Sequence, residues 1–219
     1  MIFANRREAG RSLAHRLEKY ANRKDVVVLG IPRGGVPVAF EIAQALHAPL
    51  DVFLLRKLGV PGHEEFAFGA IASGGVRVLD RETAAALGIT DAQVRAVTAR
   101  EHAELNRRET AYRDSRPPVQ VEGRTVILVD DGIATGASLL AGIHALRQLK
   151  PAKIVVAAPV TSRQAAYRLS REVDDLVFED APLTFRAVGQ FYKDFSEVSD
   201  EEVIGLLARS QESWTGRAA

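Results

Sequence analysis

The chain has 219 residues, of which 47% are hydrophobic and 26% are charged, as in an ordinary globular protein. Its formal net charge of +1 gives no overall attraction to nucleic acid or to an acidic membrane. The absence of cysteine excludes disulfides, thiol catalysis and cysteine-ligated metals. No apolar run approaches the roughly 20 residues of a membrane span, and no secretory signal is visible, so we expect a cytoplasmic protein.

The first half of the chain alternates between helical and extended patterns. Asn5 followed by Glu8 is a helix-start signal, and Val26–Leu29 is a continuous apolar run of the kind found in strands covered on both faces. Pro37 suits the first turn of a helix. The predicted elements are a helix over 5–20, a strand over 26–29, a turn over 30–35 and a helix after it, a strand over 52–55, a loop over 58–65, a hairpin over 66–79 and a charged helix over 90–112.

The second half continues the alternation of strands and helices. The predicted elements are a strand over 126–129, a helix from about 139, a strand over 154–158, a helix from a cap at Thr161 to about 170, a strand over 175–178 and a closing helix over 199–208. This order predicts an α/β fold with a parallel twisted sheet flanked by helices on both faces. We expect one domain over residues 1–219, with ligands gathered at the carboxyl ends of the strands.

The most informative segment follows the strand at Val126–Val129. Asp130 and Asp131 stand at its end, and small residues at 132–138 lead into a helix. A carboxylate pair suits a sugar diol or a hydrated magnesium ion, because carboxylates accept hydrogen bonds. Small residues at a helix N-terminus let backbone N–H groups approach a phosphate. The plainer alternative is a strand–turn–helix with an acidic N-cap.

An apolar strand followed by Asp-Asp and a Thr-Gly turn resembles the signature of the type I phosphoribosyltransferases. The resemblance implies that Asp130 and Asp131 bind the ribose hydroxyls of phosphoribosyl diphosphate together with Mg²⁺. It also implies that the 5-phosphate lies in the following turn. The residues of that turn are Ala134, Thr135, Gly136, Ala137 and Ser138.

Two further clusters follow strands and are expected at the same edge. Arg33, Gly34 and Gly35 match the family's pyrophosphate loop, although two glycines could equally serve only to form a turn. Arg56 and Lys57 stand where the family often places a basic residue near the leaving group, and Lys57 is slightly preferred. A solvated cation pair is the alternative. The catalytic assignments are therefore Arg33, Lys57, Asp130 and Asp131.

Two segments are assigned by resemblance to variable parts of the family. Residues 58–80 would form a flexible loop plus hairpin that closes over the site, or else a plain surface loop. Residues 181–195 would form a small hood, whose aromatic side chains either stack on the base or fill the hood's own core. Ala134 stands where hypoxanthine-type members carry a third aspartate, which argues against that activity.

The resemblance predicts transfer of a ribosyl 5-phosphate group from phosphoribosyl diphosphate to a nitrogenous base, with release of pyrophosphate. The expected partners are phosphoribosyl diphosphate and a nucleobase-like acceptor, with Mg²⁺ as cofactor and a homodimer left open. No nucleic acid or membrane partner is expected. Two alternatives remain: a regulatory protein that binds phosphoribosyl diphosphate without turnover, and a hydrolase of phosphorylated sugars.

Overall fold

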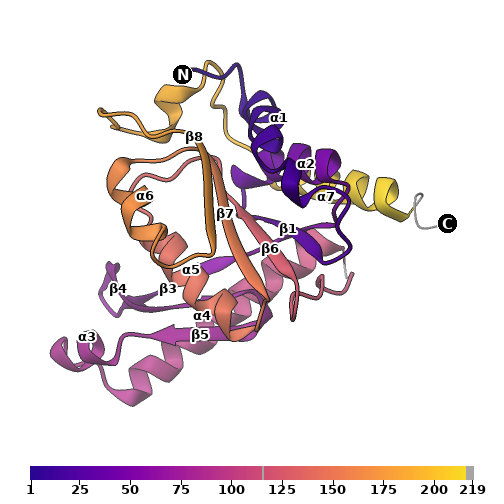
Figure 1. The fold of residues 1–219 in the computed structure, drawn as a ribbon. Helices are drawn as coiled ribbons and strands as arrows, with labels where there is room; N and C mark the ends of the chain where they lie inside the picture. Colours follow the sequence, from indigo (N-terminus) through magenta and orange to yellow (C-terminus); the bar gives the residue numbers. More distant parts are fainter. Residues whose placement is uncertain (115, 216–219) are drawn as a thin grey trace.

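The computed structural model describes residues 1–114 and 116–215, which form two sheets and their surrounding helices (Figure 1). The strands are β1 (Val26–Gly30), β2 (Leu50–Val52), β3 (Leu55–Val60), β4 (His63–Ala72), β5 (Val76–Leu79), β6 (Thr125–Val129), β7 (Lys153–Val160) and β8 (Asp175–Asp180). The helices are α1 (Arg6–Arg16), α2 (Gly35–Leu46), α3 (Arg81–Ala86), α4 (Asp91–Arg113), α5 (Ala137–Gln148), α6 (Arg163–Leu169) and α7 (Asp200–Thr215), with 3-10 turns at Glu18–Tyr20, Ser73–Gly75 and Val188–Phe191.

The larger sheet is parallel, with strand order β2-β1-β6-β7-β8. Because side chains alternate along a strand, each apolar run supplies two cores. On β1, Val26 and Val28 face the core shared with α1 and α2, whereas Val27 and Leu29 face the core shared with α5 and α6. Figure 1 shows these helix pairs on opposite faces of the sheet. The predicted parallel sheet covered on both faces is confirmed.

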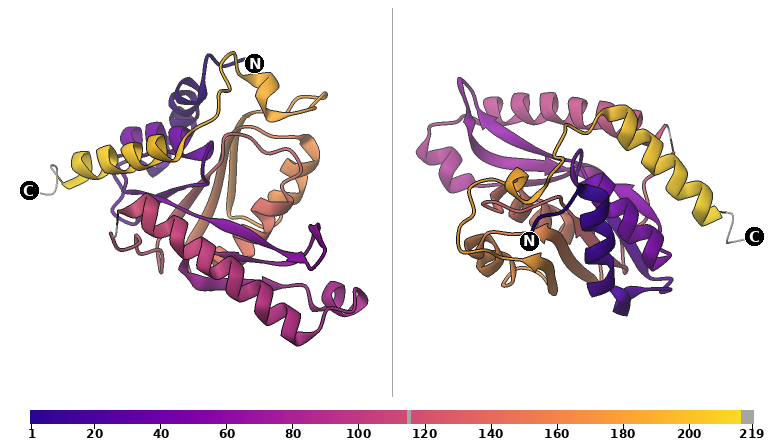
Figure 2. Two further views of the ribbon diagram at one scale, coloured as in Figure 1. Left: turned by 180° about the vertical axis from the view of Figure 1, so that it is seen from behind. Right: turned by 90° about the horizontal axis from the view of Figure 1, so that it is seen from above.

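The smaller sheet is antiparallel, with order β3-β4-β5. Its apolar face packs with α4 and α7 around Leu58, Phe68 and Leu105, all fully buried. In Figure 2, α4 and α7 lie on the same side of the molecule. These two helices therefore link the smaller sheet to the larger one.

The prediction of a loop over 58–65 is wrong in its secondary structure. β3 continues to Val60 and β4 begins at His63, so only a tight turn separates them. The strand register shifts at Gly59, where an added Cβ would lie 3.0 Å from the backbone of Glu64. Glycine here marks an irregularity where two strands approach closely rather than a loop.

Other boundaries differ in smaller ways. The strand predicted at 52–55 is instead β2 at Leu50–Val52, followed at once by β3, so Arg56 and Lys57 lie in the smaller sheet. The sixth helix is capped by Ser162 rather than Thr161, and α3 was not predicted. The charged helix predicted over 90–112 is α4, and a capping box of Thr90 and Gln93 marks its start.

The strand order places a crevice between β1 and β6. The chain moves from β1 to β2 on one side and from β6 to β7 and β8 on the other, while α2 and α5 leave toward opposite faces. Ligands of open α/β sheets bind where the loops diverge in this way, at the carboxyl ends of the strands. The loops after β1 and β6 are the ones predicted to carry the chemistry. No helix within the described residues is long and apolar enough to cross a membrane.

Candidate functional site

The turn after β1 and the acid pair after β6 meet at this crevice. Gly34 lies so close to Asp131 that an added Cβ would overlap the carboxylate. An added Cβ at Gly35 would lie 2.6 Å from the carbonyl oxygen of Val129 and 3.0 Å from the Cα of Asp130. Two segments about a hundred residues apart therefore form one surface, and both glycines are required by space. The structure thus brings together the predicted clusters at 33–35 and 130–131.

Arg6, at the start of α1, is a site residue that the sequence analysis did not find. Its Nε donates to Asp131 Oδ2 at 2.8 Å, and its Nη1 donates to the carbonyl oxygen of Ser196 at 2.8 Å. The guanidinium carbon lies 3.9 Å from the ring centre of Phe195, and the Tyr192 hydroxyl donates to the carbonyl oxygen of Asp131 at 2.6 Å. Arg6 thus connects the acid pair to the end of the predicted hood and to the residue that follows it.

The two aspartates are electrostatically unequal. Burial raises the pKa of Asp130 to about 7, with the nearby Asp131 charge as the second cause. Burial also raises the pKa of Asp131, but Arg6 opposes that effect. Asp130 accepts a hydrogen bond from the backbone N–H of Asp131 at 2.9 Å, and no cation among the described residues pairs with it. Asp130 is therefore the less compensated charge of the pair.

The turn before α5 presents an uncapped helix N-terminus. Gly136 is the N-cap in the left-handed region, with φ of 70°, and as a glycine it offers no side chain to accept a hydrogen bond from the first turn. Thr135 Oγ1 accepts only a long hydrogen bond of 3.4 Å from the N–H of Ala137. The base of the turn is fixed, because Ser162 Oγ donates to the carbonyl oxygen of Ala134 at 2.5 Å. Free N–H groups at a rigid helix start can accommodate an anion.

The predicted phosphate-binding residues are accessible as a group. Four of these five residues are exposed, and Gly136 is half-buried. The exposed residues are Ala134, Thr135, Ala137 and Ser138.

A cavity of about 260 Å³ lies beside the turn after β1 and is strongly basic. Arg33 lines it and forms an ion pair with Glu197, while its Nη1 lies 3.9 Å from Asp200. The peptide bond between Pro32 and Arg33 is cis. The lining also includes further cationic side chains, namely Arg56, Arg107 and Arg108.

Of the predicted basic pair, the structure brings only Arg56 to this cavity. Arg56 is partly buried and its Nε donates to Glu101 at 2.6 Å. Lys57 is exposed and does not line the cavity, because neighbouring residues of a strand point to opposite faces. The slight preference for Lys57 near the leaving group stays a prediction, and Arg56 is the member of the pair that lines this cavity.

Arg107 and Arg108 belong to the charged helix that the sequence predicts over 90–112. Both pair with one carboxylate, Glu104, at 2.7 and 2.8 Å, which lowers the pKa of Glu104 to about 2. Nearby, the Tyr112 hydroxyl donates to Asp200 Oδ1 at 2.6 Å. Because these two arginines share one acid, the three side chains together carry one net positive charge. Only the packing of α4 against β3 reveals this, because the local sequence alternates in charge.

The aromatic residues of the predicted hood form a small core. Phe191 and Tyr192 are buried with Phe3, and the Phe3 and Tyr192 ring centres lie 5.9 Å apart. Phe195 stacks on Tyr192 with ring centres 5.1 Å apart, while remaining 37% exposed. Of the two interpretations given for residues 181–195, the structure agrees with internal packing for Phe191 and Tyr192.

Comparison with known proteins gives a family for this arrangement. The model of the phosphoribosyl transferase domain matches residues 2–196. The chain belongs to the phosphoribosyl transferase domain family. Two Mycobacterium tuberculosis proteins, from strains CDC 1551 and H37Rv and each named provisionally as a phosphoribosyl transferase, are 43% identical to it over 218 residues.

The matched region is 100% of this chain but 49% of each mycobacterial protein, so the chain spans about half the length of these relatives. The crystal structure of TT1426 from Thermus thermophilus is 44% identical, with a TM-score of 0.83. That match covers 95% of this chain and 99% of TT1426. The fold of this family member is therefore seen in a solved relative.

Proposed function

We propose that this family member transfers a ribosyl 5-phosphate group from phosphoribosyl diphosphate to a nitrogenous base, releasing pyrophosphate. The observation that carries the proposal is the meeting of three features at one crevice. They are the acid pair at Asp130 and Asp131, the uncapped helix start at Gly136 and the basic cavity at Arg33. Together they match the diol, the 5-phosphate and the diphosphate of one molecule.

The acid pair is proposed to hold the ribose. Asp131 is oriented by Arg6 at 2.8 Å, whereas Asp130 carries the less compensated charge. Ionised carboxylates accept hydrogen bonds from hydroxyls and favour positive charge nearby. As the bond to the leaving group stretches, the ribosyl ring becomes cationic, so the same two groups would stabilise that charge.

The basic cavity is proposed to hold the leaving pyrophosphate. Arg33 would exchange its ion pair with Glu197 for phosphate oxygens, with Arg107 and Arg108 adding charge from α4. The exposed partner makes this exchange inexpensive, because Glu197 is 77% exposed and surface ion pairs contribute little. The turn from Ala134 to Ser138 would fix the 5-phosphate and so position the ring.

The donor set fits Mg²⁺ if the substrate supplies part of the shell. Within the described residues, no three His, Cys, Asp or Glu side chains gather closely enough to hold a metal on their own. Mg²⁺ commonly binds one or two carboxylates together with substrate phosphates and water. Asp130 and Asp131 would hold it, and a bound ion would supply positive charge to the leaving diphosphate.

The experiment is a panel of nucleobases with phosphoribosyl diphosphate and Mg²⁺, with released pyrophosphate as the readout. We expect turnover with at least one base and none for the double variant Asp130→Asn, Asp131→Asn. Calorimetry on the same variant should show loss of phosphoribosyl diphosphate binding, while Asp114→Asn, an exposed residue at the end of α4, keeps it. Tight binding without pyrophosphate release across the panel would contradict a transferase and indicate a binding protein.

A further inference from the structure

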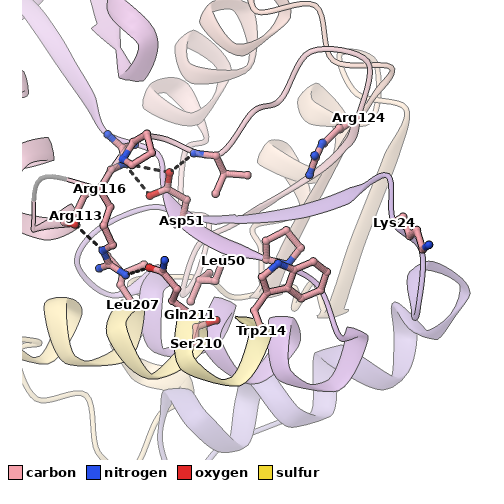
Figure 3. A pocket seen from close by; sticks show the side chains of 13 residues that line it. Lys24, Leu50, Asp51, Arg113, Arg116, Arg124, Leu207, Ser210, Gln211 and Trp214 are labelled. Carbon is pink, nitrogen blue, oxygen red and sulfur yellow. Dashed lines mark hydrogen bonds and ion pairs between the residues drawn. The ribbon is translucent and has the colours of Figure 1, made fainter. Parts of the chain in front are cut away.

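A second cavity lies at the opposite, amino-terminal edge of the parallel sheet. Its volume is about 770 Å³, within the range of small-molecule sites. Lys24 precedes β1, Leu50 begins β2 and Arg124 precedes β6, so the cavity is on the far side of the sheet from the acid pair. Figure 3 shows Trp214 and other residues of α7 along its wall.

The cavity is lined by cations that lack acidic partners. Lys24 and Arg124 form no ion pair within residues 1–114 and 116–215. Arg116 is held by neutral acceptors, since its Nε donates to the carbonyl oxygen of Arg113 at 2.6 Å and its Nη1 donates to Gln211. Figure 3 shows these three residues on different segments around the cavity. Three uncompensated positive charges around one cavity favour a polyanion.

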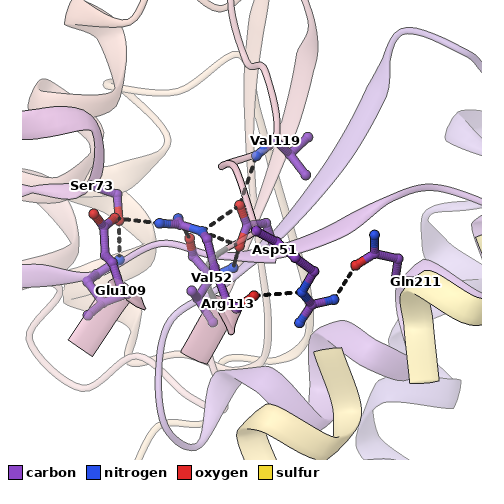
Figure 4. A network of polar contacts seen from close by, with 9 residues as sticks. Asp51, Val52, Ser73, Glu109, Arg113, Val119 and Gln211 are labelled. Carbon is purple, nitrogen blue, oxygen red and sulfur yellow. Dashed lines mark hydrogen bonds and ion pairs between the residues drawn. The ribbon is translucent and has the colours of Figure 1, made fainter. Parts of the chain in front are cut away.

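The floor of the cavity is a buried polar network around Asp51 and Arg113 (Figure 4). Asp51 accepts hydrogen bonds from Arg113 Nε at 2.9 and 3.0 Å, from the N–H of Val119 at 2.9 Å and from the N–H of Val52 at 2.7 Å. Asp51 and Arg113 are 5% and 7% exposed. Asp51 therefore pairs with Arg113, whose Nη1 also lies 3.0 Å from Glu109, and among the residues that the structure describes neither acid forms an ion pair with the other lining cations.

The remaining wall is apolar and includes a flat ring. Pro49, Leu50, Pro117 and Leu207 line it together with Trp214, the only tryptophan of the chain. The Trp214 side chain is 37% exposed, so one part of the indole is open to the cavity. Indole is a good surface for stacking a planar ring.

We propose that this cavity is a second ligand site that binds a nucleotide, with its phosphates on Lys24, Arg116 and Arg124 and its base against Trp214. The combination of cations and an indole in one cavity selects this class, because a phosphate alone would leave the apolar wall unused and a bare ring would leave the cations unused. No carboxylate pair faces this cavity within the described residues, so the proposed ligand is recognised differently from a ribose at the acid pair.

The structure also supplies a physical connection between this cavity and the acid-pair edge. In α4, Tyr112 binds Asp200 beside Arg33, while the next residue, Arg113, binds Asp51 on the cavity floor. In α7, Asp200 is at the first position and Trp214 lies near the other end. A ligand that fixes α7 at Trp214 would thus act on the helix whose first residue, Asp200, lies 3.9 Å from Arg33.

Fluorescence of Trp214 tests the site directly, because the signal has a single source. We expect ADP, added to the full chain without metal, to change the emission in a saturable way. Adenosine keeps only the base that contacts Trp214, and tripolyphosphate keeps only the phosphates that contact the cations. Both should therefore bind more weakly than ADP, by about tenfold or more. An unchanged emission at millimolar ADP, or equal affinity for tripolyphosphate and ADP, would overturn the nucleotide proposal.

The double variant Lys24→Ala, Arg124→Ala locates the binding. Neither side chain makes a hydrogen bond or ion pair within the described residues, so the fold should tolerate the change, and a thermal melt checks that. We expect ADP affinity to fall by about tenfold or more. Arg81→Ala, an exposed arginine at the start of α3, is the matched control and should leave ADP binding unchanged. Equal ADP affinity for the double variant and the parent chain would refute the site.

Discussion

The two edges of the parallel sheet use aspartate in opposite ways. At the amino edge, Asp51 is buried and accepts hydrogen bonds from one guanidinium and two backbone N–H groups. At the carboxyl edge, Asp130 accepts one backbone hydrogen bond and lies beside a second carboxylate. The first arrangement satisfies the charge within the protein. The second leaves charge for a ligand to satisfy, and this difference separates a structural acid from a binding acid.

The cationic side chains of the two edges also differ in whether they have carboxylate partners. At the carboxyl edge, Arg6, Arg33 and Arg56 each already have a carboxylate partner. At the amino edge, Lys24 and Arg124 have none within the described residues. A ligand at the first edge must therefore exchange one ion pair for another, whereas a ligand at the second edge meets unpaired charge. We expect the second edge to depend more strongly on ionic strength.

The largest expected effect comes from breaking the paired acid. Asp51→Asn leaves Arg113 buried with Glu109 as its remaining acidic neighbour, at 3.0 Å. Removing one partner of a buried pair costs about 3 kcal/mol of unfolding free energy. Urea denaturation measures this loss, and Asp114→Asn, an exposed residue in the left-handed region that asparagine tolerates, should change it by less than about 0.5 kcal/mol. Equal stabilities for the two variants would remove the structural role of Asp51.

The next effect disturbs the binding acids without changing their charge. In Gly34→Ala the new methyl group would overlap Asp131, so the carboxylate must leave Arg6 or the turn must move. We expect affinity for phosphoribosyl diphosphate to fall by about 100-fold, since positioned charge-assisted contacts are lost. The control is Gly205→Ala in α7, where an added Cβ has no neighbour within 4 Å. Calorimetry that finds similar affinities for both alanine variants would contradict the proposed site.

A smaller expected effect is a pH-dependent change in stability that comes from Asp130. The pKa of Asp130 is raised to about 7 in the folded protein, so between about pH 4 and pH 7 the folded form binds more protons than the unfolded form. Stability from this group is therefore lost as the pH rises through that window. Asp130→Asn removes the loss and should stabilise the protein by about 2 kcal/mol at pH 8, with a smaller gain near pH 4.

Thermal melts of this variant and its parent at both pH values measure the difference. The same measurements on Asp114→Asn provide the control. A gain that is independent of pH would show that Asp130 is not an uncompensated charge in the folded protein.

The features that the sequence predicted well are local in the chain. Asp130, Asp131 and the turn before α5 are consecutive, and Gly34 and Gly35 directly follow a strand. Their convergence followed from the rule that parallel strands end at one edge. The same rule could not place Arg56 and Lys57, because they belong to a second sheet. The glycine and proline residues near 59–62 are typical of a loop, so the sequence did not indicate that sheet.

The features that the sequence did not predict depend on packing between distant segments. Arg6 reaches Asp131 across 125 positions of the chain, and nothing near Arg6 distinguishes it from other helix-surface arginines. Arg107 and Arg108 lie in a helix in which acids interleave with arginines, and only the contact of α4 with β3 turns them toward Arg33. Charge pattern along one helix does not determine which charges face a site.

The smallest predicted effect tests the anion site at the carboxyl edge against that at the amino edge. The turn before α5 is expected to hold phosphate with backbone N–H groups and hydroxyls rather than with cations. In Thr135→Val one hydroxyl is lost, and within the described part of the chain its one hydrogen bond is the 3.4 Å bond from Ala137, so the fold should persist. Affinity for ribose 5-phosphate should fall about fivefold, the contribution of one hydrogen bond to a charged group at the low end of its range. Thr110→Val, an exposed position on α4, supplies the matched control.

The ADP response of Trp214 should stay unchanged in Thr135→Val, because the cavity lies at the other edge. A loss of both ligands together would mean that the two edges do not bind independently, whereas loss of neither would exclude the Thr135 hydroxyl from phosphate binding.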